Sequence, residues 1–264
     1  MKKFESKPKN GLLSPTLSSK GGEGERHFEL ISFSSDVELA NAAGREWLDE
    51  IENANRGALP HHVALSGGRI ARRFFQAVSE LVKARSTNLG SVQFFWGDER
   101  CVPPNDAESN FAAARELLLE PLSVPEAQIH RVRGEAPPQL AAAEAEAEIC
   151  RLVPLNGDGQ PILDLIFLGL GEEGHVASLF PGESEAEILS KPVYRPVIAA
   201  KPPPHRITLG YRAIVAARQV WVLASGPGKE NALRESLTST GQTPLARVLK
   251  LRSHTRIFSD IHVE

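Results

Sequence analysis

Residues 163–182 read LDLIFLGLGEEGHVASLFPG, an apolar run that passes directly into a glycine-rich segment. The apolar part, residues 163–168, has the length and composition of a strand buried on both faces of a parallel sheet. Four glycines, with Glu173 and His175, follow within residues 169–182. A plain turn needs one or two glycines and no histidine, whereas ligands of open α/β sheets bind just beyond the carboxyl ends of the strands. The segment therefore predicts a parallel sheet with a functional loop at this edge.

Strand-like and helix-like segments alternate along the rest of the chain. Apolar runs predict strands at residues 27–33, 62–65, 92–96, 163–168, 206–209, 219–224 and 255–258. Amphipathic or strongly helix-forming stretches predict helices at residues 35–53, 70–84, 109–119, 138–152 and 229–237. Such alternation is typical of βαβ units. We predict an α/β fold: a single three-layer αβα domain with a mostly parallel, Rossmann-like sheet over residues 27–264.

Composition and charge narrow the class of protein. The chain has 264 residues and a net charge of −3, without the basic excess that marks a nucleic-acid-binding surface. No stretch reaches the roughly 18–20 apolar residues of a membrane span, and residues 1–26 lack the apolar core of a secretory signal. Those residues are rich in Lys, Ser, Gly and Pro, which predicts a disordered extension. We expect a cytoplasmic monomer or small homo-oligomer that binds neither nucleic acid nor a membrane.

Four loops follow four of the expected strands, at residues 66–68, 97–100, 171–175 and 225–229. The carboxyl ends of parallel strands lie at one edge of a sheet, so we expect these loops to form one composite site.

The first of these loops, Ser66-Gly67-Gly68, opens a helix. A helix N-terminus offers unpaired N–H donors and a partial positive charge, which suit a phosphate. Arg69, Arg206 and Lys229 are candidate cations for the same anion. Each alone is better explained as a solvated surface charge, but together near one loop edge they favour a phosphate pocket.

His175 lies inside the glycine-rich loop, and its near-neutral pKa suits it to act as a general base on water. Glu173 would orient the imidazole or contact substrate hydroxyls. Ser66 and Ser178 lack the context of a nucleophile elbow, so we expect no covalent serine intermediate. Neither the two cysteines nor the histidines show metal-ligand spacing, so we expect no metal and no disulfide framework.

Five blocks of sequence resemble the 6-phosphogluconolactonase family, within the superfamily that includes glucosamine-6-phosphate deaminases. The blocks are residues 66–68, 97–103 with 109–110, 174–182, 206–209 and 228–229, in the family's order. The resemblance spans about residues 28–260. It implies hydrolysis of 6-phospho-D-glucono-1,5-lactone to 6-phospho-D-gluconate in the oxidative pentose phosphate pathway, without a cofactor.

The resemblance also implies roles for individual residues at the reacting carbon. His175 matches the histidine that activates water, with Glu173 beside it. Arg100 matches an arginine in contact with the substrate, and Asp98 of the same block is expected to bind substrate. The oxyanion formed at the lactone carbonyl would be met either by Arg100 or by backbone N–H groups of residues 171–175.

The phosphate would lie on Arg206 and Lys229, which match the family's phosphate-binding positions, and on the backbone of residues 66–68. Two positions depart from the family pattern. Arg69 stands where a small hydroxyl residue is usual, and it would add a phosphate contact or narrow the pocket. Glu173 stands where aspartate is usual, and the extra methylene moves its carboxylate by roughly 1 Å.

Two other functions remain open at this point. Glucosamine-6-phosphate deaminases usually carry Phe-Asn-Glu-Pro where this chain has Ser-Leu-Phe-Pro at residues 178–181, which lacks the carboxylate. A non-catalytic sugar-phosphate sensor would explain the departures at Arg69 and Glu173, but not the presence of His175 and Arg100.

Overall fold

The computed structural model describes residues 17–18 and 28–263, and it confirms the predicted α/β class. Its main sheet has seven strands in the order β1-β2-β10-β9-β6-β3-β4. They are β1 (Leu17–Ser18), β2 (Phe28–Ser32), β3 (His61–Leu65), β4 (Val92–Trp96), β6 (Leu165–Gly169), β9 (Gln219–Ala224) and β10 (Thr255–Ser259). Neighbours from β2 to β4 are parallel, whereas β1 runs antiparallel to β2. Apart from Leu17–Ser18, the expectation for residues 1–26 lies outside the described residues.

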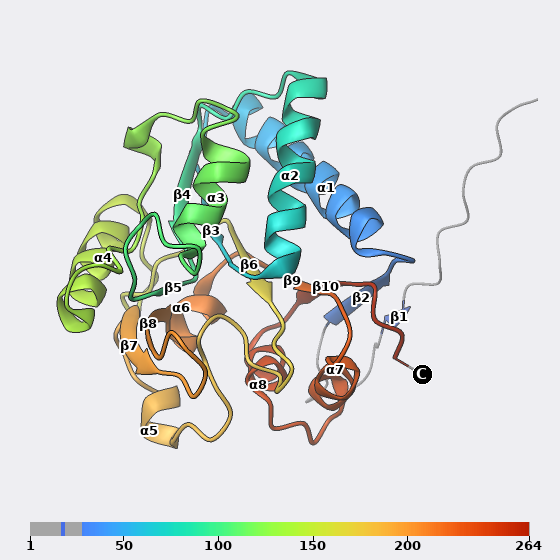
Figure 1. Ribbon diagram of the computed structural model, residues 1–264, viewed down its shortest axis with the longest axis vertical. Coiled ribbons are helices and arrows are strands. Elements are labelled where there is room, and N and C mark those ends of the chain that lie inside the picture. Colours follow the sequence, from blue (N-terminus) through green and yellow to red (C-terminus); the bar gives the residue numbers. More distant parts are fainter. Residues whose placement is uncertain (1–16, 19–27, 264) are drawn as a thin grey trace, which may run out of the picture.

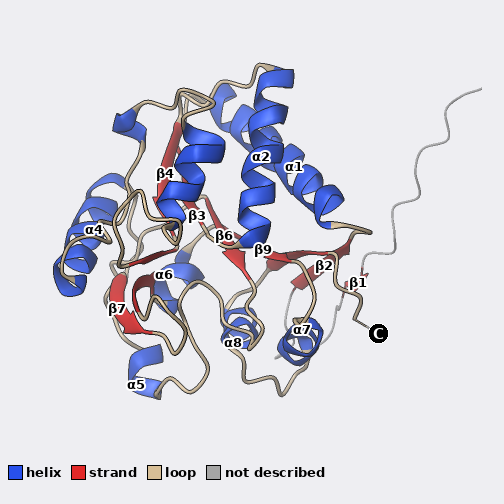
Figure 2. Cartoon of the chain, in the orientation of Figure 1, coloured by secondary structure: helices blue, strands red, loops and turns tan. Residues whose placement is uncertain are grey.

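Helices cover both faces of this sheet and complete three layers (Figure 1, Figure 2). On one face lie α1 (Asp36–Arg56) and α2 (Arg69–Arg85), and on the other α7 (Glu230–Leu237) and α8 (Pro244–Leu251). The other helical segments are α3 (Asn110–Ala114), a π-helical turn (Arg115–Leu119), a 3-10 turn (Glu126–Gln128), α4 (Pro138–Leu152), α5 (Glu185–Ile188) and α6 (Tyr211–Ala216). In the described part of the chain, none of the helices is both long and apolar enough to cross a membrane.

Aromatic side chains join α1 to the middle of the sheet. Trp47 of α1 packs edge-on against Phe167 of β6, with ring centroids 5.3 Å apart. Phe167 packs edge-on against Trp221 of β9 at 5.7 Å. All three rings are buried, and burying such large apolar side chains is the main favourable term in folding. This rigid centre holds the carboxyl ends of β6 and β9, from which two of the predicted loops emerge.

A second sheet stands beside the first, and of its strands only the one at residues 206–209 was predicted. It has three antiparallel strands in the order β5 (Asp98–Arg100), β8 (His205–Leu209) and β7 (Tyr194–Ile198). Residues 97–100, expected as a loop, therefore run into β5. Gly97 joins the two sheets, because its N–H donates to Leu65 O at 2.8 Å and its carbonyl accepts the N–H of Leu209 at 2.8 Å. The small sheet consequently presents the side chains of β5 and β8 to the loop edge of the large one.

Candidate active site

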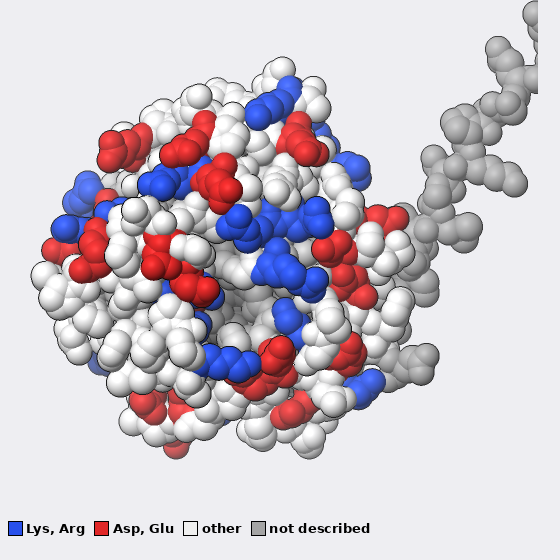
Figure 3. Space-filling model, viewed as in Figure 1, with Lys and Arg blue, Asp and Glu red and all other residues white. Residues whose placement is uncertain are grey.

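A pocket of about 260 Å³ opens at the carboxyl ends of β3, β6 and β9. Lys and Arg side chains gather around a hollow near the centre of this face (Figure 3). All the predicted site residues line the pocket: Ser66, Gly67, Gly68, Arg69, Asp98, Arg100, Glu173, His175, Arg206 and Lys229. Three polar residues that line the pocket were not among the predicted site residues, namely Asn110, Glu172 and Lys201. Asn110 could have been predicted from the sequence, since it directly follows the expected helix cap. Lys201 could not, because it precedes a run of prolines that indicates only a loop.

One end of the pocket is a cationic cradle at the start of α2. Gly68 has φ of +90°, a conformation that favours glycine, and it turns the chain from β3 into the helix. The Arg69 guanidinium lies directly against Gly226, where an added Cβ would come 1.6 Å from Nη2. Burial and then the charge of Arg69 lower the pKa of Lys229. Among the described residues neither cation forms an ion pair, so both are available to an anionic ligand.

His175 is held by the tight loop that carries it. The Gly171 N–H donates to His175 O at 2.9 Å, and a Cβ at Gly171 would come 2.0 Å from the ring. The imidazole thus lies on the Gly171 backbone, a position that any larger residue would block. Glycine at this position explains why the loop can place a ring against its own backbone.

Partial burial of His175 favours a neutral imidazole. Burial lowers its pKa, and the charges of Glu173 and Asp98 oppose that effect. Its Nδ1 is buried and makes no hydrogen bond in the described residues, but it lies 3.3 Å from Oε2 of Glu173. That contact places a carboxylate on the Nδ1 side of the ring, so Nε2 is the nitrogen that can accept a proton from a ligand or water. A neutral, oriented imidazole is the form that accepts a proton.

Asp98 is fixed by two side chains. Its Oδ2 accepts a hydrogen bond from Ser178 Oγ at 2.7 Å, and Asn110 Nδ2 donates to its Oδ1 at 3.2 Å and to its backbone carbonyl at 2.9 Å. Ser178 belongs to the loop that follows His175, so this pair ties the loop to β5. Asp98 therefore keeps one orientation beside the histidine.

The neighbouring carboxylate, Glu99, organises the backbone. It is 2% exposed and accepts hydrogen bonds from the N–H groups of Arg100, Asn110 and Phe111 and from Ser109 Oγ. Burial raises the pKa of Glu99 to about 7, and those backbone donors act against the rise. Three of these four hydrogen bonds join β5 to the N-terminus of α3, and the fourth lies within β5, so Glu99 sets where Asp98 and Arg100 stand.

Two arginines lie side by side on adjacent strands of the small sheet. Arg100 of β5 and Arg206 of β8 are paired in the strand register. Nη1 of Arg100 donates to Glu108 O at 2.5 Å, and Nε of Arg206 donates to Pro203 O at 3.1 Å. In the described residues Arg206 has no carboxylate within ion-pair distance. The charged group beside it is a second cation, Arg100. Two neighbouring guanidinium groups make this side of the pocket a second place for negative charge.

Lys201 and Glu172 close part of the mouth. Their side chains form an ion pair of 3.0 Å between the β7–β8 connection and the loop after β6. Both side chains are well exposed, so the pair contributes little to stability. Within the described residues no group of three His, Cys, Asp or Glu side chains is arranged to hold a metal ion.

The fold and the pocket together define an α/β protein with a cation-lined pocket at the carboxyl edge of a parallel sheet, the place where ligands of such sheets bind. The chain belongs to the family described as glucosamine-6-phosphate isomerases/6-phosphogluconolactonase, which matches residues 34–257. The resemblance inferred from the five sequence blocks is thereby confirmed.

Individual relatives agree with this assignment. The chain is 33% identical over 208 residues to a 6-phosphogluconolactonase of Haemophilus influenzae, covering 76% of this chain and 85% of the relative. It is 35% identical over 207 residues to a 6-phosphogluconolactonase of Mycobacterium tuberculosis, covering 77% and 83%. The structure of 6-phosphogluconolactonase from Trypanosoma brucei superimposes with a TM-score of 0.77 at 29% identity, covering 87% of this chain and 95% of that one.

Proposed function

We propose that the protein hydrolyses 6-phospho-D-glucono-1,5-lactone to 6-phospho-D-gluconate, the lactonase step of the oxidative pentose phosphate pathway. The observation that carries the proposal is the half-buried imidazole of His175, which feels the carboxylate charges of Glu173 and Asp98 in a pocket lined by five cations. Those cations are Arg69, Arg100, Lys201, Arg206 and Lys229. The names of the relatives support the same substrate.

The reaction follows from these groups. His175 Nε2 takes a proton from water as the water oxygen bonds to the lactone carbonyl carbon. The resulting oxyanion is met by Arg100 or by backbone N–H groups of residues 171–175. The bond from that carbon to the ring oxygen then breaks, and the ring oxygen takes the proton from the imidazolium. The product is an open-chain acid, which loses its proton to water.

The phosphate supplies binding energy away from the reacting carbon. The unpaired cations Arg69 and Lys229, the N-terminus of α2 and Arg206 are the candidate partners. Interactions of this kind hold the substrate in place and so favour the reaction geometry. The site needs no cofactor for this chemistry, because water is the nucleophile and a histidine is the base.

The experiment measures hydrolysis of freshly generated 6-phosphogluconolactone after subtraction of the spontaneous rate. We expect acceleration by the unaltered protein and a loss of about 10²–10⁴-fold in His175→Ala, the usual contribution of a general base. His254→Ala is the matched control, because His254 is exposed and does not line the pocket. Binding of 6-phosphogluconate without turnover would favour a sensor, and ammonia release from glucosamine 6-phosphate would favour a deaminase.

A further inference from the structure

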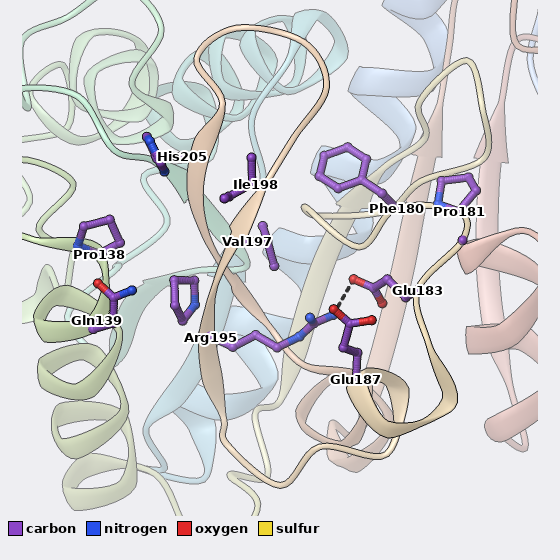
Figure 4. Close-up of a pocket in the computed structure, with 12 residues that line it drawn as sticks. Pro138, Gln139, Phe180, Pro181, Glu183, Glu187, Arg195, Val197, Ile198 and His205 are labelled. Carbon is purple, nitrogen blue, oxygen red and sulfur yellow. Dashed lines mark hydrogen bonds and ion pairs between the residues drawn. The ribbon is translucent and has the colours of Figure 1, made fainter.

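Phe180 lies against two residues of the active site. Its ring centroid is 5.1 Å from that of His175, with the planes at 50°. The Cζ of Arg206 lies 5.7 Å from the same centroid. His175 and Arg206 line the active-site pocket, whereas Phe180 lines a neighbouring cavity of about 650 Å³ (Figure 4). The ring therefore forms part of the wall between the two spaces.

This ring is not part of the hydrophobic core. The buried core and the partly buried apolar side chains packed on it include Phe111 and Phe167 but not Phe180. Phe180 is half-buried, and its ring contacts are with an imidazole and a guanidinium. Stability of the fold therefore does not explain an aromatic side chain at this position.

The backbone on both sides of Phe180 is anchored. Before it, the hydrogen bond from Ser178 Oγ to Asp98 holds the loop to β5. After it, Glu183 forms an ion pair of 2.5 Å with Arg195 of β7, and each side chain is only 11% exposed. Figure 4 shows this pair in the cavity that Phe180 lines. The backbone that carries the ring is thus held by contacts that do not involve its two site partners.

We propose that Phe180 is a positioning residue, which holds the His175 imidazole and the Arg206 guanidinium side by side and keeps water from the faces it covers. The inference rests on the proposed function, because it assigns Phe180 to the same reaction. Arg206 needs such support, since in the described residues its side chain donates only to the carbonyls of Pro203 and Lys201. An aromatic face within about 6 Å attracts a guanidinium without neutralising it.

The effect of the Phe180 ring on the pKa of His175 can be separated from the effects of the charged groups that face the imidazole. Glu173 of its own loop and Asp98 of β5 raise the pKa of His175, and Arg206 of β8 lowers it. Burial lowers it more than any of these charges changes it. Phe180 carries no charge. Its replacement therefore changes the hydration of the imidazole while the three charged residues stay unaltered.

The test compares Phe180→Leu, which keeps an apolar side chain but removes the ring, with Phe180→Tyr, which keeps the ring. The His175 pKa is measured directly by NMR titration of the imidazole, and kcat and KM are measured with the phosphorylated lactone from pH 5 to 8. In Phe180→Leu we expect the His175 pKa to rise toward its ordinary value, the acid limb of kcat to move to higher pH, and kcat/KM to fall by about threefold to thirtyfold. Phe180→Tyr should resemble the unaltered protein. Ile198→Ala is the control, because Ile198 lines the same cavity and is 75% exposed.

An unchanged His175 titration in Phe180→Leu overturns the proposal whatever happens to the rate, because a purely structural role would lower the rate without moving the titration. An equal shift in Ile198→Ala also overturns it. If the unaltered protein fails to hydrolyse the lactone, the proposed function is wrong, and the titration still reports separately on the contact between Phe180 and His175.

Discussion

Replacing Glu173 by glutamine should weaken His175 as a base. Oε2 of Glu173 lies 3.3 Å from His175 Nδ1, so its charge stabilises the imidazolium that forms when the histidine takes a proton. At 3.3 Å two unit charges attract by about 1.3 kcal/mol at the dielectric constant of water and about 2.5 kcal/mol at half that value. The Glu173 side chain is 41% exposed, which favours the lower figure. A loss of about 1 kcal/mol corresponds to a kcat lower by roughly fivefold.

The pH dependence should change in a defined direction. The Glu173 charge raises the pKa of His175 against the effect of burial, so glutamine at this position leaves the pKa lower. The imidazole then stays neutral to lower pH, and the acid limb of the kcat profile moves down by roughly 0.7 pH units. The variant is therefore slower near neutral pH and keeps a larger fraction of its own maximum in acid.

The assay is the initial rate of lactone hydrolysis from pH 5 to 8, corrected at each pH for spontaneous opening. Glu172→Gln is the matched control, because its carboxylate pairs with Lys201 rather than with the histidine. An unchanged rate together with an unmoved acid limb in Glu173→Gln would refute the electrostatic role of Glu173. An equal effect of Glu172→Gln would show that net charge at the pocket mouth, and not contact with the imidazole, is responsible.

Three further substitutions test other parts of the site. In initial-rate assays, Lys229→Ala should raise KM for the phosphorylated lactone by about tenfold and leave hydrolysis of unphosphorylated gluconolactone unchanged. Equal effects on both substrates would contradict a role of Lys229 in binding the phosphate. Gly226→Ala should displace Arg69, raise KM, and cost about 1–2 kcal/mol in urea denaturation, because φ is +95° and the new Cβ would meet the guanidinium. Glu99→Gln should lower the free energy of unfolding by about 2 kcal/mol, since its amide cannot accept all four hydrogen bonds, and full stability would show that these bonds are dispensable.

Much of the large sheet could be predicted because its elements follow hydrophobic periodicity. The strands at residues 92–96 and 219–224 and the helix at 138–152 have the predicted bounds. Buried parallel strands are continuous apolar runs, which stand out in a sequence. The small sheet could not be found in this way, because β5 is three charged residues and β7 contains a proline. Those strands exist through pairing with distant segments, which no local pattern encodes.

Most of the predicted lining of the pocket followed from one rule, that loops after parallel strands meet at one edge, whereas Arg206 was assigned from the family resemblance. That rule was enough for Ser66 and His175, which follow β3 and β6. The rule could not identify Lys201, because the β7–β8 connection reaches the pocket from the small antiparallel sheet. The contact between Phe180 and His175 was also out of reach, since it depends on how the loop folds back after Gly174.

The pocket takes one wall from each of two sheets that Gly97 joins. A ligand that touches both His175 and Arg206 therefore links the two sheets and should oppose any opening of one away from the other. Amide hydrogen exchange of β7 and β8 should report such partial opening, and a ligand at a hundred times its Kd should slow it by about a hundredfold. Proteases cleave a chain through its opened forms, so abundant ligand should lengthen the lifetime of this protein in a cell.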